Sequence, residues 1–106
     1  MTAPAPDVFA ALGNPVRRRI LELLGAGPRP SGEIAAVFEL SRPTIAEHLQ
    51  VLRAAGLLRE EARGRQRIYH IEGAGLAWAR EWLRPFELRW RRRTRIPPGY
   101  LDEEDP

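Results

Sequence analysis

The sequence contains no cysteine and no lysine, since all seventeen of its basic residues are arginine. The absence of cysteine excludes disulfide bonds, thiolate metal sites and thiol-based redox sensing. Long apolar runs are also missing, because no stretch approaches the ~20 apolar residues that a membrane span needs, and no signal-type segment follows Met1. We therefore expect a cytoplasmic protein that does not associate with membranes.

Sequence motifs of catalysis and cofactor binding are absent as well. The chain has no glycine-rich phosphate loop and no carboxylates paired at a plausible site, and neither His48 nor His70 has a recognisable catalytic neighbour. His70 also has no second metal ligand nearby in the sequence. The sequence therefore predicts no enzyme, no cofactor and no metal site.

The charge distribution favours a polyanionic partner. With 106 residues the chain fits one domain, which we place at residues 1–96. Four of the fourteen acidic residues fall in 102–105, so residues 1–101 carry seventeen basic side chains against ten acidic ones. A basic body suits nucleic acid, although a merely solvated surface is the alternative. Residues 97–106 are expected to form an acidic, flexible tail.

The segment 41–55 is predicted to be the recognition helix of a helix-turn-helix. Ser41 can act as its N-cap, and Pro43 fits the first turn, where backbone N–H groups have no helical partner. Ile45, Leu49 and Leu52 share one stripe, while the opposite face is polar or small. Upstream, residues 31–38 repeat this pattern with Ser31 as the expected N-cap. Only two residues separate the helices, a spacing that presents the second helix to a DNA major groove.

The N-terminal part is predicted to contain two further helices. Residues 7–12 form a short helix that Gly13 ends, and Asn14 and Pro15 open another helix through Leu24. Among the arginines at 17–19, Arg18 is expected to point outward, and its two neighbours flank the apolar stripe of this helix. They are open to a role in binding backbone phosphates, and a solvated helix face explains them equally well.

A basic β-hairpin follows the recognition helix and is interpreted as a wing, over residues 58–71. Strands are expected at 58–61 and 66–71, around a glycine-bearing tip at 62–65. Arg63, Arg65 and Arg67 cluster at this tip, where short hairpins can follow a phosphate backbone or reach a minor groove. Solubility alone is the alternative reason for a charged tip.

The segment 75–95 is predicted to be a C-terminal dimerisation helix. Its apolar residues form one stripe that is rich in tryptophan, and Pro85 should kink or restart the helix. The stripe would either close the core of the monomer or, as we favour, form an interface between subunits. The expected interface residues are Phe9, Leu12, Trp78, Trp82, Leu83, Phe86 and Trp90. The fold class is therefore mainly α with a small β-hairpin: a winged helix-turn-helix with an added C-terminal helix.

The sequence resembles the ArsR/SmtB family of winged-helix transcriptional repressors. Matching segments run from Phe9 to Ile71 with almost no offset in spacing: FAALGNPVRRRILELL, SGEIA, SRPTIAEHLQVLRAAGLL and GRQRIYHI. The segment WLRPFELRW, residues 82–90, further resembles a branch of the family without metal-site cysteines. The resemblance implies a homodimer, joined through its first and last helices, that binds a palindromic operator.

Carried over by position, the resemblance places a set of side chains against DNA. Glu47 departs from the family, which usually has a basic residue there. A carboxylate can accept a hydrogen bond from a cytosine amino group, or Glu47 pairs with an arginine and reads nothing. His48 is assigned a structural role rather than a ligand role. The full DNA-contacting set is Ser41, Arg42, Thr44, Ala46, Glu47 and Gln50, with Arg63, Arg65 and Arg67 from the wing.

The sequence thus favours a homodimeric repressor whose partner is double-stranded operator DNA. The alternative is a protein-interaction module that keeps the winged-helix scaffold and uses its aromatic C-terminal helix to bind another protein. A small-molecule effector beneath the tryptophans is a further alternative, since a ligand pocket and a dimer interface would use the same aromatic residues.

Overall fold

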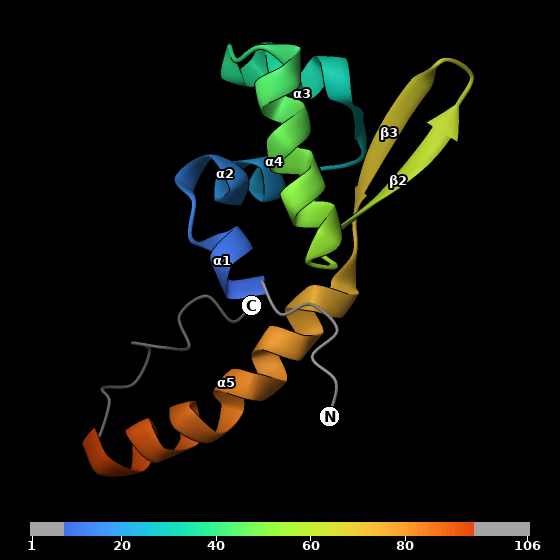
Figure 1. The fold of residues 1–106 in the computed structure, drawn as a ribbon. Helices are drawn as coiled ribbons and strands as arrows, with labels where there is room; N and C mark the ends of the chain where they lie inside the picture. Colours follow the sequence, from blue (N-terminus) through green and yellow to red (C-terminus); the bar gives the residue numbers. More distant parts are fainter. Residues whose placement is uncertain (1–7, 95–106) are drawn as a thin grey trace.

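Five helices and three short strands make up residues 8–94, which are the part of the chain that this computed structural model describes. The predicted tail at 97–106 lies outside the described residues. In Figure 1 the hairpin projects from one side of a body of four helices, and the last helix extends away in the opposite direction. The elements in chain order are α1 (Val8–Leu12), α2 (Pro15–Gly25), β1 (Arg29–Pro30), α3 (Ser31–Phe38), α4 (Arg42–Ala54), β2 (Leu58–Arg63), β3 (Gln66–Ile71) and α5 (Gly73–Thr94).

The N-terminal ends of two helices follow the caps that the sequence predicts, and a third does not. The Asn14 side chain accepts a hydrogen bond from the backbone N–H of Arg17, and the Ser41 side chain accepts one from Thr44. The prediction that Ser31 caps α3 is wrong. Ser31 is already the first residue of α3, and the N-cap is Pro30, which makes no side-chain cap bond. Pro30 belongs to β1 and has an extended backbone, so the helix begins directly after the strand.

The short turn between α3 and α4 sets the direction of the second helix. Glu39 has a left-handed backbone with φ of 56°, and its N–H and that of Leu40 bond back to the last carbonyls of α3. This conformation reverses the chain within three residues. As a result α4 crosses α3, and one side of α4 faces outward (Figure 1).

The strands form a three-stranded antiparallel sheet in the order β1-β3-β2. The edge strand β1 was not predicted, because Pro28 and Pro30 suggested only a break, yet proline is acceptable in an edge strand. The hairpin tip is also shorter than expected. β2 continues to Arg63, which pairs with Gln66, so only Gly64 and Arg65 form the loop. Gly64 has φ of +63°, a conformation that suits glycine at the start of a two-residue loop.

The core lies between the helices and the base of the sheet. The predicted stripe of α4 is confirmed, since Ile45, Leu49 and Leu52 are at most 1% exposed. Of α5, only its first turns contribute, through Ala79 and the partly buried Trp78. The other largest buried side chains are Val8, Ile20, Ile34 and Leu57.

Helix α5 begins two residues earlier than expected, at Gly73, and continues through Pro85 without a break. The predicted fresh start at Pro85 is therefore wrong; the helix instead curves over this half in Figure 1. Proline removes one backbone hydrogen bond and crowds the preceding turn. Because residues 80–93 are all exposed, water can bond to the carbonyl that Pro85 leaves unpaired.

One close backbone contact fixes where α5 leaves the body. The N–H of Gly75 donates to the carbonyl of Gly56, at 2.8 Å. A Cβ on Gly75 would lie 2.5 Å from the carbonyl oxygen of Ala55 and 2.9 Å from that of Gly56. Only glycine therefore allows α5 to pack directly on the turn that ends α4.

Candidate nucleic-acid interface

The outer face of α4 is not covered by any described part of the chain. Arg42, Ala46, Glu47 and Gln50 are exposed, and Thr44 is partly exposed. The opposite face carries the buried leucines and isoleucine of the core. This arrangement leaves a row of polar and small side chains over three turns of one helix, the kind of surface that enters a major groove.

The start of α4 is held in place by a pair of hydroxyl groups. Ser41 Oγ accepts from the N–H of Thr44, at 3.2 Å, and donates to Thr44 Oγ1, at 3.0 Å. Ser41 is therefore occupied by its capping role. Thr44 accepts in this pair, so its hydroxyl hydrogen is available to a partner outside the helix.

Glu47 and Gln50 differ in whether another side chain of the protein bonds to them. Within residues 8–94, Glu47 has no hydrogen bond or ion pair, so the alternative that it pairs with a neighbouring arginine is not realised. The Gln50 carbonyl oxygen accepts from Arg53, at 3.3 Å, which leaves the amide hydrogens of Gln50 to donate elsewhere.

His48 is held by Arg17, which supports the structural role predicted for it. The Arg17 guanidinium lies 3.3 Å from His48 Nδ1 and also donates to the carbonyls of Ala10 and Ala11. Because a guanidinium can only donate, His48 Nδ1 is the acceptor in this contact. No three described His, Asp or Glu side chains are grouped so that they could hold a metal ion.

Two of the three consecutive arginines in α2 donate hydrogen bonds to backbone carbonyls of α1. Arg17 bonds to carbonyls of α1, and Arg18 donates to the carbonyl of Leu12, at 2.7 Å. These are the carbonyls that a short helix leaves unpaired at its C-terminal end. Arg17 is therefore occupied by α1 and His48, whereas Arg18 and Arg19 are exposed and the phosphate-binding role stays open to them.

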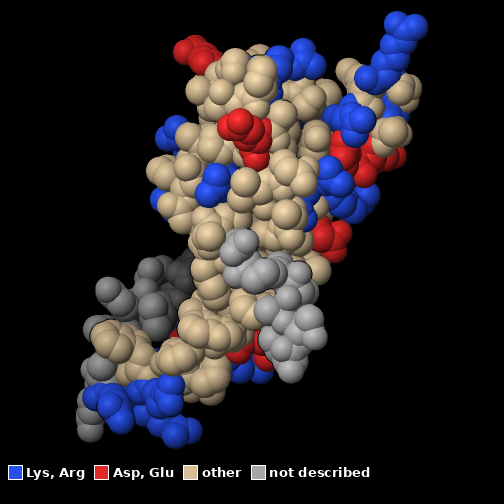
Figure 2. All heavy atoms as spheres, in the orientation of Figure 1, with Lys and Arg blue, Asp and Glu red and all other residues tan. Residues whose placement is uncertain are grey.

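In the wing, two of the three predicted DNA-contacting arginines are paired with carboxylates. Arg63 lies 3.2 Å from Glu61, and Arg67 bonds to Glu60, while Arg65 at the tip has no partner within the described residues. In Figure 2 the basic groups reach the end of the wing and the acidic groups lie nearer its base. Arg65 is therefore the wing cation most accessible to an external anion.

The two wing carboxylates were not singled out from the sequence, although both are strongly bonded. Bonding from Arg67, aided by the nearby charge of Arg53, holds the pKa of Glu60 below its ordinary value. Hydrogen bonds from His70 and then Arg63 lower the pKa of Glu61. Both are ionised at neutral pH. Their bonds follow from the register of the hairpin, in which Glu60 is a diagonal neighbour of Arg67 and Glu61 of His70.

The aromatic side chains of α1 and α5 form one continuous surface. The ring of Phe9 lies 5.8 Å from that of Trp78 and 5.3 Å from that of Trp82, and Trp82 lies 4.8 Å from Phe86. Phe9 therefore contacts α5 of its own chain, and Leu12 packs against the core, a role that the sequence did not indicate. Trp82, Leu83, Phe86 and Trp90 each remain about half exposed.

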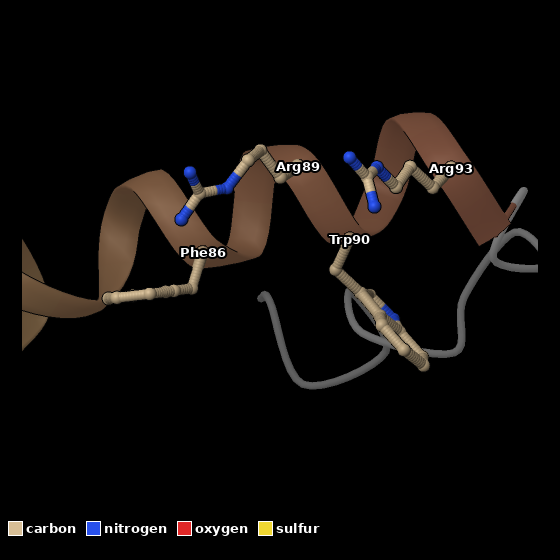
Figure 3. Close-up of a pocket in the computed structure, with 4 residues that line it drawn as sticks. All are labelled: Phe86, Arg89, Trp90 and Arg93. Atoms are coloured by element: carbon tan, nitrogen blue, oxygen red, sulfur yellow. The ribbon is translucent and has the colours of Figure 1, made fainter.

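The far end of α5 combines aromatic and basic groups. Phe86 and Trp90 project from the same side of the helix in Figure 3, and Arg89 and Arg93 lie beside them. The Arg89 guanidinium lies 5.1 Å from the centre of the Phe86 ring, within reach of a cation–π contact. We call the face formed by Phe9, Trp78, Trp82, Leu83, Phe86 and Trp90 the aromatic face.

No helix in residues 8–94 has the length and hydropathy to cross a bilayer.

Comparisons with known proteins agree with this geometry. A family model described as a helix-turn-helix domain matches residues 12–61. The transcriptional regulator Rv2034 of Mycobacterium tuberculosis is 38% identical over 100 residues, covering 93% of this chain and 88% of the relative. The transcriptional repressor SdpR of Bacillus subtilis is 34% identical, covering 76% of this chain and 89% of the relative.

Solved structures show the same architecture. An ArsR-like transcriptional regulator from Rhodococcus is 36% identical with a TM-score of 0.74, covering 82% of this chain and 80% of that one. The homodimeric winged helix-turn-helix domain of Mb0332 from Mycobacterium bovis is 29% identical with a TM-score of 0.61, covering 85% and 82%. The winged helix-turn-helix predicted from the sequence is confirmed.

Proposed function

Since the chain belongs to the ArsR/SmtB family of winged helix-turn-helix transcriptional regulators, we propose that it is a homodimeric repressor of a palindromic DNA operator. Its relatives regulate transcription and are not enzymes. The observation that carries the proposal is the uncovered polar face of α4, next to a wing that ends in an unpaired arginine.

The proposed DNA contacts divide into two groups by position. On α4, Arg42, Thr44, Glu47 and Gln50 would meet base edges and flanking phosphates, with Ala46 allowing close approach and Ser41 fixing the helix start. On the wing, Arg65 would contact the backbone directly. Arg63 and Arg67 would share their charge between a wing carboxylate and DNA, because each already has an acidic partner.

The proposed dimer is supported by the aromatic face. Trp82, Leu83, Phe86 and Trp90 are each about half exposed, and apolar side chains of this size resemble the centre of a protein interface more than an ordinary surface. The neighbour Mb0332 is homodimeric, and its fold covers most of this chain. A second copy on the aromatic face would leave both α4 helices free to reach successive major grooves.

Footprinting of the purified protein on DNA upstream of its own coding region tests this proposal. We expect a protected palindrome whose half-sites are centred roughly 34 to 36 Å apart, one turn of B-DNA. Random DNA of equal length serves as the control. Equal affinity for both DNAs would contradict operator recognition, and no DNA binding at all would favour the alternative of a protein-interaction module.

The wing assignment predicts a specific change in salt dependence. Arg65→Ala should reduce the slope of log binding constant against log salt by about one, because one phosphate contact and its released counterion are lost. Preference among operator sequences should stay the same, since a backbone contact carries no base information. The measurement is a salt titration by fluorescence anisotropy.

A matched control separates this effect from net charge alone. Arg80 is exposed, and by helical spacing it lies opposite Trp78 and Trp82 on α5. Arg80→Ala removes the same charge far from the proposed DNA contacts and should leave the slope nearly unchanged. Equal slopes for wild type and Arg65→Ala would show that the wing does not bind DNA.

A further inference from the structure

We infer that Glu60 is a positioning residue, which fixes the wing against the recognition helix and aims Arg53 and Arg67 at the DNA backbone. This inference rests on the proposed function, since it assigns a role within the same DNA-binding surface. The inference goes beyond the proposed function because it gives an acidic residue a favourable role in DNA binding. A carboxylate so close to DNA would ordinarily weaken binding by repelling phosphate.

Glu60 is bonded to side chains from two different elements of the structure. One carboxylate oxygen lies 2.9 Å from Arg53 Nη1, at the end of α4, and the other bonds to Arg67 on β3. The Tyr69 hydroxyl donates to the same second oxygen, at 3.4 Å. The Glu60 side chain is only 12% exposed, whereas those of Arg53 and Arg67 are 41% and 69% exposed. The carboxylate thus lies beneath two guanidinium groups that face outward.

This position makes Glu60 a link between two parts that must act together on DNA. The wing leaves α4 through three residues, 55–57, and projects from the body in Figure 1. An ion pair from α4 to β2 restrains the angle between the helix and the hairpin. The ion pairs with Glu60 also hold the side chains of Arg53 and Arg67 in place before DNA binds. These side chains therefore lose less conformational entropy when they contact phosphate.

Glu61 provides a matched comparison within the same strand. It carries the same charge, but its partners Arg63 and His70 both belong to the wing itself. Neither bond reaches α4. Removing the charge of Glu61 therefore changes the electrostatic field of the wing without releasing the wing from the recognition helix.

The inference predicts opposite outcomes for these two residues on operator DNA. Both Glu60→Gln and Glu61→Gln remove one negative charge and should tighten binding to random DNA a few-fold at low salt. On the operator, Glu61→Gln should also bind tighter. Glu60→Gln should bind about tenfold or more weakly, because the helix and wing no longer meet the duplex in one geometry.

The readout is the ratio of operator affinity to random-DNA affinity, measured by anisotropy for each variant after its folding is checked by circular dichroism. Arg53→Gln should lower this ratio as Glu60→Gln does, and the double variant should lower it no further than Glu60→Gln, because Arg53 restrains the wing only through its ion pair with Glu60. If Glu60→Gln instead tightens operator binding as Glu61→Gln does, the positioning role is refuted while operator binding by the wild type stands.

A second measurement is independent of DNA. Residual dipolar couplings of the free protein report the orientation of β2 and β3 relative to α4. We expect a reorientation or averaging of the hairpin in Glu60→Gln and none in Glu61→Gln. If the couplings of Glu60→Gln match those of the wild type, as those of Glu61→Gln should, the inference is overturned. This test holds even without an operator. A wild type that binds no operator would refute only the proposed function.

Discussion

Replacing Trp82 by arginine is expected to convert the protein to a monomer and to weaken operator binding more than 100-fold. Trp82 lies at the centre of the aromatic face, in contact with Phe9 and Phe86, and is about half exposed. A charge there would have to be desolvated when a second copy covers the face. A monomer would hold one half-site only and lose the gain of about 10² to 10⁴ that linking two sites provides.

Sedimentation velocity and a gel shift on the same samples check this result. The side chain of Trp82 does not belong to the buried core, so the variant should keep its fold. Val37→Arg is the control, because it also replaces an exposed apolar side chain by arginine. Val37 is 54% exposed and lies on α3, away from the aromatic face. A Trp82→Arg protein that still sediments as a dimer would show that the subunits join elsewhere.

Gly75→Ala is expected to lower the free energy of unfolding, whereas the same change at Gly73, the other glycine of α5, is not. The added methyl group would meet backbone carbonyl oxygens of Ala55 and Gly56, closer than any real Cβ contact. Neither oxygen can rotate away, so α5 must shift from the turn that it packs on. Overpacking of this kind costs about 1–3 kcal/mol, which thermal and urea denaturation would reveal.

Gly73 offers the opposite outcome in the same helix. A Cβ at Gly73 would meet nothing within 4 Å. Gly73→Ala should therefore be neutral or stabilise the protein by up to about 1 kcal/mol, since alanine favours helix and glycine does not. Equal stabilities of the two variants would mean that α5 does not approach the α4 turn as closely as described.

Features set by local chemistry were predictable from the sequence. The caps at Asn14 and Ser41 and the buried stripe of Ile45, Leu49 and Leu52 depend on residues within one or two turns of each other. The same holds for the two-helix spacing that makes the helix-turn-helix. These features positioned the outer face of α4, which is the main part of the candidate site.

Features that depend on distant partners were missed or misplaced. β1 forms only because Arg29 and Pro30 pair with β3, about forty residues later. The continuation of α5 through Pro85 depends on the exposure of that segment. Phe9 meets Trp78 and Trp82 within one chain, and Glu60 gains its partners only when α4 and the hairpin are assembled. No period or motif in the sequence encodes such contacts.

The outer half of α5 has one further consequence. Beyond Ala79 the helix has no support from the core, and it includes Pro85 and a run of arginines toward its end. An isolated helix of this length is marginal in water. In the proposed homodimer, winding of this segment and pairing of the two subunits would therefore be one thermodynamic step, so that the concentration of the protein would set how much of it is fully folded. A dimeric repressor built in this way would leave its operator as its concentration falls.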